Sequence, residues 1–140
     1  MRAVVGVAAA VAVLALVGCA ASPLVAHRRG GVAADRAALL QAWSTPATQP
    51  GWLPADATGI RWVAATRGGA DRAPAAIEAR SDARLPASCT PAGSVAGVAI
   101  TASWSPDRAP VDVRRCGNWA VAAVPGGWYG WTPADRGTSG

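Results

Sequence analysis

Three cysteines are the residues of this 140-residue chain whose chemistry is easiest to state. Cys19 ends an uncharged, mostly apolar run that begins at Ala3, and small residues and Pro23 follow it. Its thiol is the best soft nucleophile of this segment, so it is a candidate for covalent modification. Cys89 and Cys116 lie much later in the chain and are candidates for a disulfide.

The tetrad Leu16-Val17-Gly18-Cys19 resembles a bacterial lipobox. The resemblance implies that Cys19 receives a diacylglyceryl group through a thioether. It also implies that a signal peptidase cuts before Cys19, where Gly18 has no side chain to obstruct the enzyme. Two acyl chains anchor a protein stably, at about 0.8 kcal/mol per buried methylene, whereas one chain binds only marginally. We therefore predict attachment to membrane lipid through Cys19, on the extracytoplasmic face of the cell membrane.

The apolar run has the length of a signal peptide. Ala3 to Val17 falls within the usual 7–15 residues of a signal core, and a transmembrane helix needs roughly 20. Two alternatives stay open, an uncleaved single-span anchor and a secretory signal with an accidental cysteine. The predicted organisation is a lipoprotein signal peptide at 1–18, a flexible tether at 19–34 and a single small disulfide-bonded domain at 35–140.

The disulfide prediction follows from counting cysteines. If Cys19 carries lipid, Cys89 and Cys116 remain as an even pair in an oxidising compartment. Cys116 ends a predicted strand at a Gly-Asn turn, and Cys89 lies in a Pro-flanked loop.

Catalytic chemistry has little support in the predicted domain. The only histidine, His27, lies in the tether, and the chain has no lysine. This excludes Ser-His-Asp, Cys-His and Ser-Lys arrangements within residues 35–140. No zinc-ligand spacing occurs, and we expect neither a metal nor another cofactor. Two converging carboxylates, as in a hydrolase, remain the exception, although most of the eight acids lie in predicted turns.

The basic charge does not indicate a nucleic-acid partner. The formal net charge is +5. Arg2 leaves with the signal, and Arg28 and Arg29 lie in the tether beside the membrane, where anionic headgroups would attract them. The remaining arginines are scattered among the acids rather than clustered.

Tryptophan is the unusual component of the composition, with seven copies against one tyrosine and no phenylalanine. Trp119 and Trp128 fall on the more polar face of the sheet predicted for residues 111–132, near Arg114. Indole rings beside a guanidinium group form a platform for a sugar ring. The opposing interpretation is that these rings cover the disulfide. An envelope glycan and a protein are therefore the two kinds of partner to consider.

The elements that position these residues are short. Asp35 to Trp43 is a helix candidate, with Asp35 as its cap and Leu39, Leu40 and Trp43 on one face. Alternation predicts a hairpin of strands at 58–65 and 75–80, and a further strand at 98–104.

Three further strands are expected at 111–116, 119–124 and 128–132, with two-residue turns at Gly117-Asn118 and Gly126-Gly127. These turns place Cys116 opposite Trp119 and Ala122 opposite Trp131. The predicted core face comprises Val111, Val113, Arg115, Ala120, Ala122, Val124, Tyr129 and Trp131. The predicted polar face comprises Asp112, Arg114, Cys116, Trp119, Val121, Ala123, Trp128 and Thr132.

The fold class that follows is α+β, a small antiparallel sheet with a C-terminal three-stranded meander and one or two short helices, preceded by the N-terminal signal helix. The stretches "LPADATGIRW", "ARLPASC" and "ASWSPDRAPVDVRRCGNWAVAAVPGGWYGWTP", together with the lipobox, resemble a group of small exported actinobacterial lipoproteins. The shared features are the cysteine pair and the Tyr129-Gly130-Trp131 end strand. The resemblance implies grouping and fold, and it implies no activity and no functional residue. The function expected is a lipid-anchored cell-envelope module for binding or structure, with a glycan-binding module as the alternative.

Overall fold

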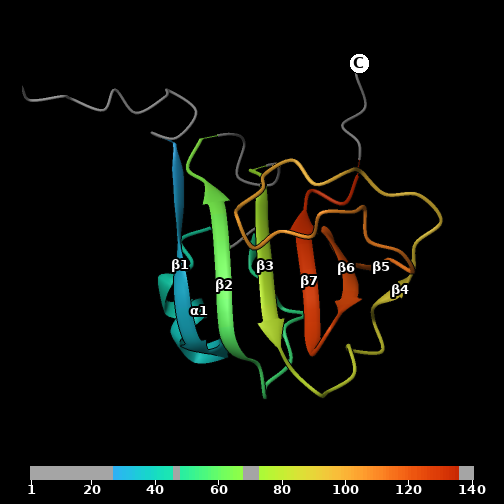
Figure 1. The fold of residues 1–140 in the computed structure, drawn as a ribbon, viewed down its shortest axis with the longest axis horizontal. Helices are drawn as coiled ribbons and strands as arrows, with labels where there is room; N and C mark the ends of the chain where they lie inside the picture. The colour runs from blue at the N-terminus through green and yellow to red at the C-terminus, as the bar shows by residue number, and fades with distance from the viewer. Residues whose placement is uncertain (1–26, 46–47, 68–72, 136–140) are drawn as a thin grey trace, which may run out of the picture.

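A seven-stranded sheet forms the centre of the protein in the computed structural model, which describes residues 27–45, 48–67 and 73–135. All paired strands are antiparallel. The strands are β1 (Arg28–Asp35), β2 (Thr58–Ala65), β3 (Ala75–Arg80), β4 (Thr90–Pro91), β5 (Arg114–Cys116), β6 (Trp119–Val124) and β7 (Gly127–Thr132). Their order across the sheet is β1-β2-β3-β7-β6-β5-β4 (Figure 1).

One helix, α1 (Arg36–Ala42), is present among the described residues. The sheet-rich fold with a short helix is therefore confirmed, while the predicted signal helix at 1–18 lies outside the described residues. Within the described part of the chain, no helix has the length and apolar character needed to cross a membrane.

Helix α1 begins and ends where its sequence predicts. The Asp35 carboxylate accepts a 2.8 Å hydrogen bond from the backbone N–H of Ala38, which caps the first turn. Leu39 is fully buried, and the backbone returns to an extended conformation at Trp43. The helix thus places Leu39 and Trp43 against one face of the sheet.

The second half of the predicted tether is not a tether. Residues 28–34 belong to strand β1, which pairs along its length with β2. The glycine pair suggested flexibility, but Gly30 serves a close approach. A methyl group at Gly30 would lie 2.7 Å from the Trp62 carbonyl oxygen, closer than real Cβ contacts, whereas one at Gly31 would make ordinary contact, 3.6 Å from the Trp62 Nε1 atom. Small residues in β1 therefore allow it to pack closely beside β2.

The two predicted hairpin and meander arrangements are present. Strands β2 and β3 pair with Trp62 opposite Ile77, and β5, β6 and β7 are sequential neighbours. Cys116 lies opposite Trp119, as expected. The predicted pairing of Ala122 with Trp131 is wrong, because Ala122 lies opposite Tyr129.

The difference comes from the position of the last turn. Val124 pairs with Gly127, so the turn residues are Pro125 and Gly126, and Gly126 has the positive φ of 77°. The register moves by two residues, and a shift of two keeps every side chain on its predicted face. The predicted assignment of meander side chains to two faces is therefore correct, although the predicted pairing of β6 with β7 is not.

Both faces of the sheet are buried. On one face, Ile60, Ile77 and Val121 pack with α1 and with residues of the 48–57 and 85–89 segments. On the other face, Ala120, Ala122, Tyr129 and Trp131 pack with Ile100 and its neighbours. The face predicted to be polar is thus a second core, because the helix and two loops cover it. Val111, predicted for the core, is 76% exposed.

The predicted strand at 98–104 is absent. Residues 92–113 contain no helix or strand and cross the sheet over β3 and β7 (Figure 1, yellow to orange). Ile100 is buried there, and Val98, Ala102 and Trp104 are partly buried. These residues cover a sheet face instead of pairing at a sheet edge. A covering segment and a strand can both bury alternate side chains, so the alternation in the sequence did not distinguish them.

Candidate functional site

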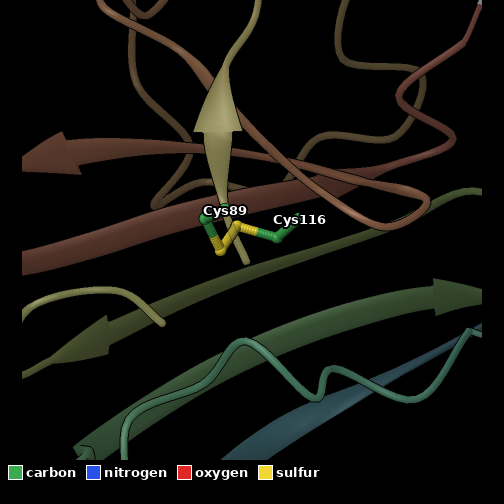
Figure 2. Close-up of a disulfide and its surroundings, with 2 residues drawn as sticks. All are labelled: Cys89 and Cys116. Carbon is green, nitrogen blue, oxygen red and sulfur yellow. A yellow bond between two sulfur atoms is a disulfide. The ribbon is translucent and has the colours of Figure 1, made fainter. Parts of the chain in front are cut away.

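The predicted disulfide is present, and the predicted lipidation of Cys19 stays a prediction. Cys19, the predicted lipidation residue, lies outside the described residues. Cys89 and Cys116 form a disulfide with a Cα–Cα distance of 4.4 Å (Figure 2). Cys116 ends β5, and Cys89 follows a turn closed by its own N–H donating to the Pro86 carbonyl at 2.9 Å. The bond therefore ties the loop before β4 to the end of β5.

Trp119 does not belong to an open platform. This residue is 2% exposed, and its indole N–H donates to the Thr48 carbonyl at 3.2 Å. The rings of Trp43 and Trp52 contact it, with centroids at 5.9 and 5.8 Å. The predicted pairing of Trp119 and Trp128 as a ligand surface is therefore wrong, because Trp119 is a core residue beneath the 48–57 loop.

Trp128 and Arg114 do come together. Both line a hollow of about 300 Å³ beside the disulfide, and Arg84 lines it with them. Arg84 and Arg114 are exposed, and Trp128 is half-buried. The Trp128 indole N–H donates to the Ala83 carbonyl at 3.0 Å, which orients the ring.

The position of Arg84 beside Arg114 and Trp128 was not predicted from the sequence, although a usable signal was present. Arg84 lies five residues before Cys89, and Arg114 lies two residues before Cys116. A disulfide between these cysteines brings the two arginine-bearing segments side by side. Used as a distance restraint, the predicted disulfide would have placed both guanidinium groups in one region.

A second hollow, of about 370 Å³, lies between the sheet and the 92–113 segment. Its lining includes Tyr129, Trp131, Val98 and Val113. The Tyr129 hydroxyl donates to Ser105 Oγ at 3.4 Å, and burial raises the pKa of Tyr129. The Trp131 indole N–H donates to the Ala96 carbonyl at 2.8 Å. These bonds attach the covering segment to β7.

Several carboxylates have structural partners. Asp35 caps α1, Glu78 pairs with Arg61, and Asp135 pairs with Arg115 at 2.5 Å. Asp56 accepts a 2.5 Å hydrogen bond from the Ser81 hydroxyl. Among the described residues, no three His, Cys, Asp or Glu side chains gather as a metal site would require.

Comparison with known proteins adds no relative: the chain matches no protein-family model, no curated protein and no solved structure.

Proposed function

We propose that this protein is a lipid-anchored module of the cell envelope, held on the extracytoplasmic face of the membrane through Cys19 and acting there by binding or structural support. The observation that carries the proposal is the disulfide between Cys89 and Cys116. Structural disulfides persist in oxidising compartments and are rare in the cytosol of mesophiles. The disulfide uses two of the three cysteines and leaves Cys19, at the end of the signal-length run, for lipid.

In this proposal a short connection joins the anchor to the domain. Eight residues separate Cys19 from Arg28, the first residue of β1. A fully extended connection of this length spans at most about 30 Å. The domain would therefore remain close to the bilayer, with Arg28 and Arg29 at the start of the sheet within reach of anionic headgroups. Each such charge contributes about 1 kcal/mol near the surface.

The short connection also restricts the kind of partner. A module held this close to the bilayer meets membrane lipid, envelope proteins and the cell-wall glycan nearest the membrane. No arrangement for catalysis is part of the proposal, since the carboxylates with known contacts serve structure. The proposed role is therefore recognition or support.

Replacement of Cys19 tests the anchor. Cys19→Ala should abolish membrane retention or leave an unprocessed precursor, because no thiol remains to accept the diacylglyceryl group. Ser22→Ala is the matched control, since it alters a small side chain near the processing site without removing the thiol. Intact-mass analysis of the membrane fraction should show a wild-type chain that begins at Cys19 and carries added acyl mass.

Three other results would overturn the proposal. A mature membrane-bound chain that still begins at Met1 would establish the uncleaved single-span alternative. A wild-type chain found in the medium without acyl mass would establish simple secretion. Labelling of Cys89 and Cys116 as free thiols in intact cells would contradict the oxidising location itself.

A further inference from the structure

The hollow beside the disulfide combines two cations with an aromatic ring. Arg84 comes from the loop after β3, Arg114 begins β5, and Trp128 lies in β7. The rest of the lining is apolar and comprises Leu85, Pro86, Ala87 and Cys89. Three separate segments of the chain thus contribute the groups that give this hollow its chemical character.

The two arginines of this hollow form no ion pair among the described residues. No carboxylate of the described residues lines it. The ion pairs in the described part of the chain join Arg61 to Glu78 and Arg115 to Asp135, and neither involves Arg84 or Arg114. Two arginines lining one concave surface give it a positive potential, which favours a bound anion.

The segments that carry these groups are held in place before any ligand arrives. Trp128 is bonded through its indole N–H to Ala83, the residue before Arg84. Ala83 donates its backbone N–H to Ser81 Oγ at 3.1 Å, and Ser81 donates its backbone N–H to the Gly126 carbonyl at 3.2 Å. The disulfide fixes the chain two residues beyond Arg114 (Figure 2). Preorganisation of this kind lowers the entropy that binding costs.

The geometry points to a binding site for an anionic sugar, formed by Arg84, Arg114 and Trp128. Guanidinium groups bind carboxylate and phosphate oxygens in bidentate geometry. The partly exposed indole offers an apolar surface to the C–H face of a pyranose ring. A volume of about 300 Å³ is at the small end of ligand sites, which suits a single sugar residue. The shared ligand chemistry is a carboxylate or phosphate carried on a sugar ring.

This inference rests on the proposed function for its location, since the cell envelope is where such glycans occur. It also corrects the platform expected from the sequence. Trp119 takes no part because its ring is buried, and Arg84 takes its place. The ligand class changes accordingly, from sugars in general to sugars that carry a negative charge.

Titration of the full chain in a non-ionic detergent tests the site. The probes are N-acetylmuramic acid, N-acetylglucosamine 6-phosphate, neutral N-acetylglucosamine and inorganic phosphate alone. Calorimetry should show binding of at least one charged sugar about tenfold tighter than the neutral sugar, because charge-assisted hydrogen bonds are the strong ones. Binding should weaken as salt is added, because both guanidinium groups are exposed. Preference for one charged sugar identifies a carboxylate or a phosphate source.

Single substitutions assign the site to its residues. Arg84→Gln and Arg114→Gln should each weaken binding about tenfold. Arg108→Gln is the matched control, because Arg108 is an exposed arginine at the other hollow, and it should leave binding unchanged. Thermal melting of each variant shows whether the fold is intact, and both charge substitutions at exposed positions should leave it within a few degrees of wild type.

The inference is overturned if the neutral sugar binds as tightly as the charged sugars, or if Arg108→Gln reduces binding as much as the other two variants. Inorganic phosphate binding as tightly as the sugar phosphate would reduce the site to an anion site and remove the role of Trp128. The Cys19→Ala chain separates this inference from the anchor. It should bind the probe normally even where the anchor proposal fails.

Discussion

The ring of Trp52 lies directly against the backbone of Gly130 in β7. A methyl group at Gly130 would lie 2.4 Å from the Trp52 Cζ2 atom, which is closer than real Cβ contacts. Trp52 is 3% exposed and also contacts Trp119. The absence of a side chain at Gly130 therefore leaves room for the Trp52 ring, and the loop that carries Trp52 buries this face of the sheet.

Gly130→Ala should lower the free energy of unfolding by about 1–3 kcal/mol, since overpacking a filled core costs this much. The measurement is urea unfolding followed by circular dichroism. Gly93→Ala is the matched control, because a methyl group there would meet nothing within 4 Å. Equal stability of the two variants would show that the Trp52 loop moves aside without cost.

Removal of the disulfide should cost stability mainly through the unfolded chain. The bond joins residues 27 apart in sequence. The chain-entropy model gives about 3.6 kcal/mol for a closed loop of this size, out of the 5–15 kcal/mol typical of small domains. The Cys89→Ser/Cys116→Ser double variant should therefore show a markedly lower urea midpoint.

A reducing agent should reproduce this loss in the wild-type protein and leave the double variant unchanged, which separates the disulfide from other effects of serine. An unchanged urea midpoint on reduction would mean that packing of Cys89 and Cys116, rather than their covalent bond, holds the loop.

Tyrosinate absorbance in an alkaline titration should report on Tyr129 alone. It is the only tyrosine, and the chain has no lysine. Burial raises the pKa of Tyr129 above its ordinary value of 10.0; the hydrogen bond with Ser105 opposes this rise, and the charge of Glu78 adds to it. The unfolded chain loses the phenolic proton first. The contribution to stability is therefore complete below about pH 10 and is lost as pH rises through the folded pKa.

Near-ultraviolet absorbance of tyrosinate measures this directly, with a higher midpoint expected for the native protein than for the urea-unfolded chain. Tyr129→Phe removes the signal and should flatten the alkaline decline in stability. Coincident titration of native and unfolded chains would contradict the burial of the hydroxyl beneath the 92–113 segment.

Local patterns in the sequence determined much of the fold. Asp35 followed by an apolar helical spacing was sufficient for α1, and alternation was sufficient for β2 and β3. The Gly117-Asn118 turn set Cys116 opposite Trp119. Counting cysteines was sufficient for the disulfide. These features depend on interactions between residues close in sequence or on an even number of thiols. Both can be read from the sequence alone.

The tertiary structure decided which surfaces were open. Alternation along β6 and β7 shows that a strand has two faces, but it does not show whether a distant segment covers the second one. Residues 48–57 cover Trp119, and the segment 92–113 covers Tyr129. Strand β1 likewise forms because the free edge of β2 accepts it, although its own small residues suggested a tether. Arg84 and Arg114 lie in one hollow because the folded chain and its disulfide bring their two segments together. Burial and proximity between segments that are far apart in sequence depend on how the whole chain packs.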